Sequence, residues 1–274
     1  MANPVDTVVL ITGASSGIGW NCANFLSEKG YKVSGTTRNP QKFADQTQPF
    51  TMVAMDVEQD ASVQQAVNEV LNHEERIDIL VNNAGVAVMG PLEDTSIEQA
   101  RKVYETNVLG IQRTIMAVLP TMRYHGGGTI INVSSIAGQF GLPYRSIYSA
   151  SKAAVGKLIE SIHYELAPLN IKVVLVEPGD VKTAINDHRA VAEGSSSKGV
   201  YEKAFQHVAK GINEDVSHGI SPVVVSQCIE KIIRNPNPRI RYIVSPLIPK
   251  LAVILNHLLP SWAFQWIIRK NAGI

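Results

Sequence analysis

Short apolar runs rich in valine and isoleucine recur along the chain, and longer segments with a helical spacing of apolar residues separate them. Such runs are typical of buried strands, whereas apolar residues at intervals of roughly three to four are typical of amphipathic helices. The predicted strands span residues 7–12, 32–36, 50–55, 77–81, 129–133 and 171–176. The predicted helices span residues 17–29, 61–73, 96–119 and 148–167.

The alternation of strands with helices indicates how the elements connect. A helix between two strands returns the chain across the sheet, so the strands run parallel and helices cover both faces. The pattern therefore predicts an α/β fold of the Rossmann type, a doubly wound parallel sheet of about seven strands whose ligands bind at the strand carboxyl ends. No repeat or low-complexity block interrupts it, and 274 residues suit a single domain over 1–274.

Composition and charge narrow the function classes. Hydrophobic residues make up 45% of the chain and charged residues 18%, which is ordinary for a globular protein. The formal net charge of +1 argues against nucleic acid as a partner. Cys22 and Cys228 have neither metal-ligand nor Cys-x-x-Cys spacing, which is typical of buried residues in a reducing compartment. The N-terminal residues lack the features of a secretory signal, so we expect a cytoplasmic protein.

The segment 131–152, INVSSIAGQFGLPYRSIYSASK, brings together groups suited to proton transfer. Tyr148 and Lys152 are four residues apart, so on a helix their side chains share one face. An adjacent ammonium would lower the pKa of the phenol from its unperturbed value of about 10, making it usable as a proton donor or acceptor. Ser135, just after the predicted strand 129–133, would present its hydroxyl beside the helix.

A glycine-rich turn follows the first predicted strand. The sequence Thr12-Gly13-Ala14-Ser15-Ser16-Gly17-Ile18-Gly19 leads directly into a predicted helix, and its glycines permit a tight turn close to a ligand. The free N–H groups and partial positive charge of a helix N-terminus suit an anion such as a pyrophosphate. An ordinary glycine turn without a ligand is the alternative interpretation.

These motifs together resemble the short-chain dehydrogenase/reductase family. The spacing Gly-x-x-x-Gly-x-Gly occurs with Asn82-Asn83-Ala84-Gly85 after the fourth strand, and both are similar to motifs of the family. The residues that match its catalytic tetrad in order and spacing are Asn107, Ser135, Tyr148 and Lys152. The segment Pro178-Gly179-Asp180-Val181-Lys182-Thr183 is similar to its Pro-Gly-x-x-x-Thr motif, so the resemblance extends from about Thr7 to Thr183.

The resemblance implies hydride transfer between a nicotinamide cofactor and a carbonyl or alcohol. During reduction Tyr148 would protonate the carbonyl oxygen, and Ser135 would donate a hydrogen bond to that oxygen as negative charge develops. Lys152 would lower the pKa of the phenol and bind the nicotinamide ribose. Asn107, inside the predicted helix 96–119, resembles the family residue that interrupts helical hydrogen bonding and holds a water in a proton relay.

The end of the second strand bears on the choice of cofactor. An acidic side chain there would bind the adenosine ribose of NAD and repel a 2′-phosphate. Thr37 fills that position and Arg38 follows, and a guanidinium can bind phosphate bidentately. We therefore expect NADP(H) over NAD(H), unless Arg38 only stacks on adenine or lies in solvent. The expected cofactor contacts, several by resemblance, are Gly13, Ser15, Ser16, Gly17, Ile18, Gly19, Thr37, Arg38, Asp56, Val57, Asn83, Ala84, Gly85, Tyr148, Lys152, Pro178, Gly179, Val181 and Thr183.

The sequence is less specific beyond Thr183. Residues 184–220 show little periodicity and include a glycine- and serine-rich stretch, which is typical of a lid that closes over a substrate. Their histidines lack ligand spacing, so we assign no metal. Segments 86–89 and 139–145 are mainly apolar and would line a pocket for a small hydrophobic carbonyl or alcohol. A steroid, a retinoid or a long-chain acyl derivative fits this description, as in hydroxysteroid and retinol dehydrogenases.

Residues 245–274 form an apolar C-terminal extension with two interpretations. Prolines interrupt the apolar run over 243–268, and no stretch approaches the roughly 20 residues that span a bilayer. Trp262, Phe264 and Trp266 with Arg269 and Lys270 could form an interfacial helix in peripheral contact with an anionic membrane. Packing against the core or a neighbouring subunit is the alternative. Because family members pair the helices that correspond to 96–119 and 148–167, we also expect a homodimer or homotetramer.

The sequence thus predicts an NADP(H)-dependent oxidoreductase that acts on a lipophilic ketone or secondary alcohol, with Tyr148 as general acid and base. Two alternatives remain open. One is a 3-oxoacyl thioester reductase of lipid metabolism. The other is a dinucleotide-binding regulator without chemistry, against which the complete set of matched catalytic residues argues.

Overall fold

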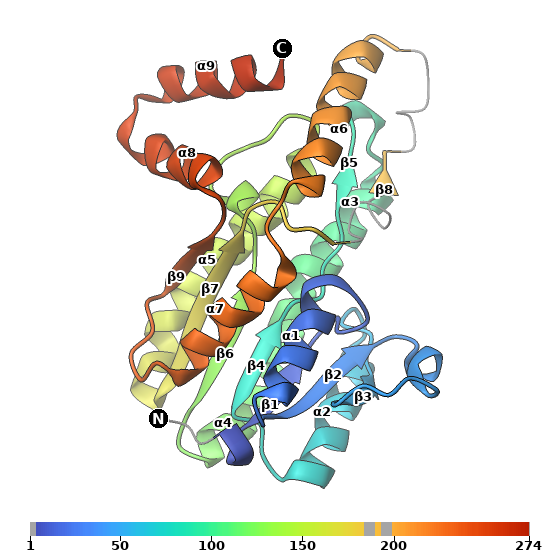
Figure 1. The fold of residues 1–274 in the computed structure, drawn as a ribbon, viewed down its shortest axis with the longest axis vertical. Coiled ribbons are helices and arrows are strands. Elements are labelled where there is room, and N and C mark those ends of the chain that lie inside the picture. The colour runs from blue at the N-terminus through green and yellow to red at the C-terminus, as the bar shows by residue number, and fades with distance from the viewer. Residues whose placement is uncertain (1–3, 184–189, 193–198, 274) are drawn as a thin grey trace.

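The computed structural model describes residues 4–183, 190–192 and 199–273 (Figure 1). The strands are β1 (Val8–Ile11), β2 (Lys32–Thr37), β3 (Thr51–Ala54), β4 (Ile79–Asn82), β5 (Val88–Met89), β6 (Gly128–Val133), β7 (Ile171–Pro178), β8 (Ala190–Val191) and β9 (Arg241–Val244). The α-helices are α1 (Gly17–Glu28), α2 (Asp60–Glu74), α3 (Ile97–Tyr104), α4 (Gly110–Tyr124), α5 (Ser146–Leu166), α6 (Glu202–Ser217), α7 (Pro222–Arg234), α8 (Leu247–Leu258) and α9 (Ser261–Ala272). The 3-10 segments are η1 (Pro4–Asp6), η2 (Pro40–Phe43), η3 (Leu92–Asp94), η5 (Ile136–Gly138) and η6 (Ala167–Leu169), and η4 (Glu105–Leu109) is a π-helix.

The main sheet has seven strands, all parallel, in the order β3-β2-β1-β4-β6-β7-β9. The chain winds outward in both directions from β1 and β4, where the strand order reverses. The predicted Rossmann-type, doubly wound α/β fold is therefore confirmed. The carboxyl ends of β1 and β4 mark the place where ligands of this fold bind.

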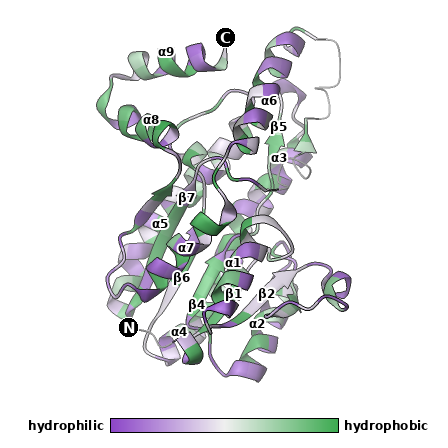
Figure 2. Ribbon diagram, viewed as in Figure 1, coloured by the Kyte–Doolittle hydropathy of each residue, from purple (hydrophilic) through white to green (hydrophobic). Residues whose placement is uncertain are grey.

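Both faces of the sheet are buried, which explains why its strands appear in the sequence as continuous apolar runs. On β1, Val8 and Leu10 join one hydrophobic core with α2, α4 and α5, whereas Val9 and Ile11 join the other with α1 and α7. Figure 1 shows α1 and α7 in front of the sheet. In Figure 2 the central strands are coloured mainly as hydrophobic, while the helices around them are mixed.

The long helix predicted over 96–119 is divided into three parts. A capping box between Ser96 and Gln99 starts α3, and π-helical η4 then separates α3 from α4. The predicted end at 119 is wrong, because α4 continues to Tyr124 with Pro120 inside it. Proline usually ends a helix, so the sequence pattern was misleading at this position. The helix predicted over 148–167 begins earlier, at Ser146.

Part of the predicted lid is helical. α6 occupies Glu202–Ser217, and its apolar residues Val208, Ile212 and Val216 recur at helical spacing, so the prediction of little periodicity was wrong there. Its N-cap residue, Tyr201, makes no side-chain capping bond, so the usual start signal is missing. Residues 184–189 and the glycine- and serine-rich residues 193–198 of the lid lie outside the described residues, and lid closure stays a prediction.

The C-terminal residues form a pair of helices that follow the last strand of the sheet. Pro246 directly precedes α8 and Pro260 directly precedes α9, so two of the prolines that interrupt the apolar run mark helix starts. Figure 1 shows α8 and α9 beyond the end of β9, at the same end of the molecule as α6. Among the described residues, none of the helices combines the length and apolar character needed to cross a bilayer.

Candidate active site

The glycine-rich turn joins β1 to α1 at the carboxyl edge of the sheet. Gly13 has a φ of +67°, and a Cβ at this residue would lie 2.8 Å from the Cα of Ala84, so the position requires glycine. A Cβ on Gly19 would overlap the carbonyl of Gly13. Ser15 and Ser16 are exposed, so the backbone N–H groups at the start of α1 lie at an accessible surface.

Thr12 and Asn83 connect this turn to the segment that follows β4. The Thr12 hydroxyl accepts hydrogen bonds from the backbone N–H groups of Asn83 and Ala84, both at 3.0 Å. The Asn83 side-chain amide donates to the carbonyls of Thr12 and Gly13, also at 3.0 Å. These bonds cross the point where the strand order reverses, so two predicted cofactor motifs form one surface.

The third predicted motif lies over the start of α1. A Cβ built on Gly17 would lie 3.4 Å from the side chain of Thr183. Pro178 ends β7, and the segment from Gly179 to Thr183 follows it. The buried Val181 anchors this segment through a parallel β-bridge to Ile220. Small residues and accessible backbone at this edge fit the pyrophosphate of a dinucleotide. Ile18 is half-buried behind the turn, packed against the α1–α7 core.

The ends of β2 and β3 form the outer part of this edge. Thr37 is buried and Arg38 is exposed, and their cofactor contacts stay a prediction. Val57 is buried against α4, while Asp56 is partly exposed. Burial would raise the pKa of the Glu58 carboxyl, but hydrogen bonds from Lys102 and Thr106 outweigh it and lower that pKa.

Asn107 lies in the π-helical segment and is completely buried. Its side-chain oxygen accepts from the backbone N–H of Val86 at 2.8 Å, and its amide donates to the Val86 carbonyl at 2.9 Å and to the Ser151 hydroxyl at 3.1 Å. The side chain therefore holds the segment after Gly85 in place. The predicted water relay from Asn107 stays a prediction.

Lys152 has an ammonium in a buried position. The residue is 5% exposed, and its Nζ donates to the carbonyl of Val133 at 3.2 Å. A Cβ built on Gly85 would lie 3.7 Å from this Nζ and 3.3 Å from the Oδ1 of Asn107, so both groups border one small space. Burial lowers the pKa of the Lys152 ammonium from 10.5 to about 8.

Tyr148 and Ser135 complete the group. Tyr148 lies in the first turns of α5 and is half-buried, with its ring centroid 5.8 Å from the Nζ of Lys152. Ser135 caps η5, where its hydroxyl oxygen accepts from the backbone N–H of Ala137 at 3.1 Å. Because the oxygen accepts this bond, the hydroxyl proton can be donated elsewhere. The structure thus places a phenol and an ammonium in the first turns of α5, and a hydroxyl just after the carboxyl end of β6.

An apolar wall lies next to this group. Met89 packs with Val208 and Ile212 of α6, and Tyr144 and Phe205 flank them with ring centroids 5.5 Å apart. Tyr144 also has a φ of +58°, a left-handed conformation that is uncommon for a non-glycine residue and costs of order 1–3 kcal/mol. The Tyr144 carbonyl accepts from the backbone N–H of Gly90 at 2.9 Å, which ties segment 139–145 to the end of β5. The sequence did not predict that a helix, α6, would form part of this wall.

Sequence reasoning missed a buried carboxylate beside the same segment. Glu177 on β7 is 1% exposed and accepts from Gln139 at 2.5 Å and from Arg241 at 2.6 Å. Arg241 also donates to Glu160 of α5 at 2.7 Å. Burial raises the pKa of the Glu177 carboxyl, although Arg241 opposes the rise. No local pattern could have shown this network, since its members come from β7, β9, α5 and the segment after η5.

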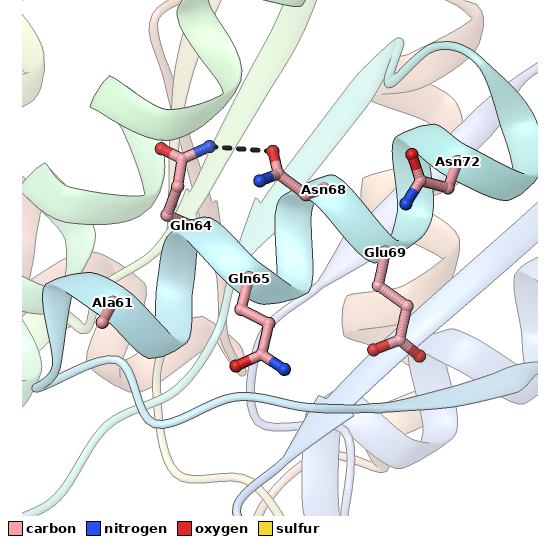
Figure 3. Close-up of a pocket in the computed structure, with 6 residues that line it drawn as sticks. All are labelled: Ala61, Gln64, Gln65, Asn68, Glu69 and Asn72. Atoms are coloured by element: carbon pink, nitrogen blue, oxygen red, sulfur yellow. Dashed lines mark hydrogen bonds between the residues drawn. The ribbon is translucent and has the colours of Figure 1, made fainter.

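A hollow on the outer face of α2 lies apart from these residues (Figure 3). The residues that line it are Ala61, Gln64, Gln65, Asn68, Glu69 and Asn72. Gln64 donates to Asn68 at 3.0 Å, and amides of this kind do not exchange protons as acids or bases. None of the predicted site residues lines this hollow, and we assign it no chemistry.

Cysteine and metal-ligand positions add no further chemistry. Cys22 is buried, which raises the pKa of its thiol to about 12, and Cys228 is half-buried; both are free. Among residues 4–183, 190–192 and 199–273, no group of three or more His, Cys, Asp or Glu side chains is placed to hold a metal ion.

Comparison with known proteins places these motifs in context. The family model for short chain dehydrogenase matches residues 7–193. A 3-ketodihydrosphingosine reductase of Bacteroides thetaiotaomicron is 38% identical over 262 residues, which cover 96% of this chain and 96% of that protein. A short chain dehydrogenase/reductase of Burkholderia phymatum in complex with NAD superposes with a TM-score of 0.81 at 25% identity, covering 94% of this chain and 95% of that one. The closed form of a serine dehydrogenase complexed with NADP+ gives 0.75 at 26% identity, with coverage of 88% and 95%.

Proposed function

Because this chain belongs to the short-chain dehydrogenase family, whose members are oxidoreductases that use a nicotinamide cofactor, we propose that it transfers hydride between NADP(H) and a lipophilic ketone or secondary alcohol. The observation that supports this most is the buried Lys152 ammonium beside the Tyr148 ring, at the edge of the sheet that carries the glycine turn. A protein that only bound a dinucleotide would not need a buried ammonium next to a phenol.

The proposed roles follow from the positions of the side chains. Ser135 donates its hydroxyl proton in a hydrogen bond to the substrate oxygen, which stabilises the negative charge that develops there. Tyr148 transfers its proton to the same oxygen during reduction and takes it back during oxidation. Lys152 stabilises the phenolate that remains, because its ammonium lies on the same face of α5. Asn107 holds the loop at Gly85 and Val86 that borders this space.

Support for NADP(H) comes from the end of β2. When NADP(H) binds, its 2′-phosphate would need a cation near the end of β2. Arg38, which follows Thr37, would supply that cation. Arg38 is exposed, and although its charge helps to lower the pKa of the nearby Glu58, the hydrogen bonds to that carboxylate come from Lys102 and Thr106. A guanidinium with exposed N–H groups can therefore bind the phosphate.

Support for a lipophilic substrate comes from the apolar wall and from one relative. Met89, Val208 and Ile212 are buried together with Phe205 packed against them, so this side of the region offers little to hydrogen-bond a sugar or a charged acid. The relative named 3-ketodihydrosphingosine reductase is a reductase of a ketone on a lipid. We therefore propose a ketone or secondary alcohol on a long-chain lipid as the substrate class, and reduction as the direction to test first.

The test is the loss of NADPH absorbance on adding a panel of ketones that includes 3-ketodihydrosphingosine, simple hydrophobic ketones and 3-oxoacyl thioesters. We expect turnover of the lipophilic ketones. Tyr148→Phe should lower kcat by about 10²- to 10⁴-fold, because the general acid is lost. The same variant should bind NADPH with an unchanged affinity, measured by fluorescence.

Two results would contradict the proposal. Preference for thioesters over free ketones would favour the 3-oxoacyl reductase. Equal loss of cofactor binding and turnover in Tyr148→Phe would make Tyr148 a structural residue and not a proton donor.

We also propose that copies of the chain pair through α4 and α5. Leu109, Met116 and Tyr164 are exposed apolar residues on η4, α4 and α5, at 41%, 61% and 74% exposure. Burial of such side chains in a two-fold symmetric interface would stabilise a homodimer.

A further inference from the structure

The outer surfaces of α8 and α9 carry a dense group of exposed apolar side chains. We call this group with its neighbouring cations the α8–α9 face. Its apolar members are Leu247, Ile248, Leu251, Ile254, Leu258, Trp262 and Trp266. Leu247, Ile248, Trp262 and Leu258 are 73% to 85% exposed, which is unusual for large apolar residues that lie close together. Figure 2 shows α8 coloured mainly as hydrophobic.

The spacing of these residues makes one continuous stripe. Leu247, Leu251, Ile254 and Leu258 are separated by four, three and four residues, so they follow one side of α8. The stripe adjoins the inward-packed Val253, which is 4% exposed, and two of its members, Ile254 and Leu258, also border a hollow between α8, α5 and β9. In α9, Trp262 and Trp266 also lie one turn apart on the outer side, while Phe264 is buried.

All the Lys, Arg, Asp and Glu side chains of residues 245–274 are cations. Residues 245–274 contain Lys250, Arg269 and Lys270 and no aspartate or glutamate. All three cations are exposed, and the Nζ of Lys270 lies 5.0 Å from the ring centroid of Trp266. Apolar side chains, tryptophans and cations together are the combination that binds at the surface of an anionic bilayer.

We propose that the α8–α9 face docks on an anionic lipid surface. The charges favour this occupant over a second copy of the chain. A two-fold interface would place this patch against itself, so its three cations would find no carboxylate from residues 245–274 of the other copy to pair with. Anionic headgroups complement all three cations, and the tryptophan rings lie well at the boundary between headgroups and acyl chains.

The inner side of the same helices contacts the substrate region. Phe264 packs edge to face on Phe140 with ring centroids 5.1 Å apart. The Asn256 amide donates to the carbonyl of Gln139 at 3.2 Å, and Ala272 packs at the edge of the cluster formed by Met89 and α6. Docking of the outer side would therefore bring segment 139–145 close to the lipid. On this basis, and resting on the proposed function, the substrate is a lipid taken from the membrane.

Vesicle flotation tests the docking without any need for turnover. Wild-type protein is mixed with phosphatidylcholine vesicles and with vesicles that also contain phosphatidylglycerol, and we expect it to float only with the second. The triple variant Lys250→Gln, Arg269→Gln, Lys270→Gln should partition about 100-fold less, because each cation near an anionic surface contributes roughly fivefold. The double variant Trp262→Ser, Trp266→Ser should also stay in the soluble fraction.

A matched control separates this face from exposed apolar residues in general. Tyr124 is 85% exposed at the end of α4, next to the start of β6 and so at the opposite edge of the sheet. Tyr124→Ser should float as the wild type does. All variants should reduce a water-soluble ketone at the wild-type rate, since no substituted residue belongs to the proposed active site.

Three outcomes would overturn the docking proposal. The first is absence of flotation with either vesicle, and the second is equal flotation of the wild type and the triple cation variant. The third is a wild-type dimer that binds no vesicles and becomes a monomer in the variant Trp262→Ser, Trp266→Ser. That result would identify the α8–α9 face as a subunit interface. Flotation of a protein that reduces none of the ketones would instead contradict the proposed function and leave the docking intact.

Discussion

At the scale of single residues, the buried Lys152 ammonium is an energetic cost that the proposed site imposes on the fold. Its ammonium is buried, with a pKa of about 8 against 10.5 for a free lysine. The folded state therefore disfavours the charged form. Below pH 8 both the folded and unfolded chains are protonated, so the full cost is present. Between pH 8 and 10.5 only the unfolded chain keeps the proton, and stability rises with pH.

We expect Lys152→Met to be inactive but more stable than the wild type without cofactor. The free energy of unfolding in urea should rise by ~3 kcal/mol at about pH 7 and by only ~1 kcal/mol at about pH 10. Lys157→Met is the matched control, because Lys157 lies on the same helix with its side chain 84% exposed, and its effect should stay within about 0.5 kcal/mol. An equal effect of Lys152→Met at both pH values would show that its ammonium is not destabilised by burial.

Arg38 is the residue on which the proposed choice of cofactor depends. Arg38→Asp removes the guanidinium and adds a carboxylate that repels a 2′-phosphate and can accept from ribose hydroxyls. The ratio of NADPH to NADH affinity should fall by about 10- to 100-fold, measured by cofactor fluorescence. Arg239→Asp makes the same charge change at an exposed position just before β9 and should leave the ratio unchanged. Unaltered affinities in Arg38→Asp would remove the case for NADP(H).

Sequence spacing was informative about residues that act locally. Tyr148 and Lys152 share a helix face because they are four apart, and the structure places the ammonium beside the ring. The pairing of Glu177 with Arg241 could not be predicted, since the residues are 64 apart and meet only through the sheet. Likewise, nothing in the segment from Gln139 to Arg145 indicated that Tyr144 would adopt a left-handed backbone.

At the scale of elements, the buried charges between β7, β9 and α5 hold the last strand to the sheet. Arg241→Leu would leave Glu177 buried without its cation and should destabilise the fold by about 3–5 kcal/mol, measured by urea unfolding. The pKa of Glu177 is already raised by burial, and loss of Arg241 would raise it further. The folded variant then binds a proton that the unfolded chain lacks, so its stability should fall as pH rises above the ordinary pKa of a glutamate.

Arg239→Leu provides the comparison for this prediction. Arg239 is exposed and precedes the same strand, so its loss should change stability by less than about 0.5 kcal/mol. Equal effects of the two substitutions would show that the network around Glu177 does not stabilise β9.

The elements that the sequence predicted well are those buried on both sides. β1, β6 and β7 are surrounded by apolar partners, so their composition alone identifies them. α6 was missed although Phe205, Val208, Ile212 and Val216 recur at helical spacing, because its start lacks a capping side chain and follows the glycine- and serine-rich stretch. η4 was predicted only as a site of interrupted helical bonding at Asn107, since a π-helical turn has no distinct sequence pattern.

At the scale of the whole molecule, we expect the proposed pairing through α4 and α5 to depend on Met116. Met116→Lys would place a charge on each side of a two-fold interface, where the like charges would repel each other. Light scattering coupled to gel filtration should then show a monomer where the wild type gives a dimer. Val5→Lys, at a residue 64% exposed in η1, should leave the mass unchanged. A wild-type monomer, or a Met116→Lys dimer, would contradict the pairing.

The two ends of the described chain lie at opposite edges of the sheet. η1 begins at Pro4 just before the start of β1, whereas α9 ends beside α6, where a Cβ on Gly273 would lie 2.6 Å from the ring of His207 (Figure 1). A purification tag that follows Gly273 would start beside α6 and the apolar wall of the substrate region, whereas one that precedes Pro4 would start at the opposite edge of the sheet. Activity assays are therefore best designed with an N-terminal tag, and a C-terminal tag should be cleaved before any ketone is judged inert.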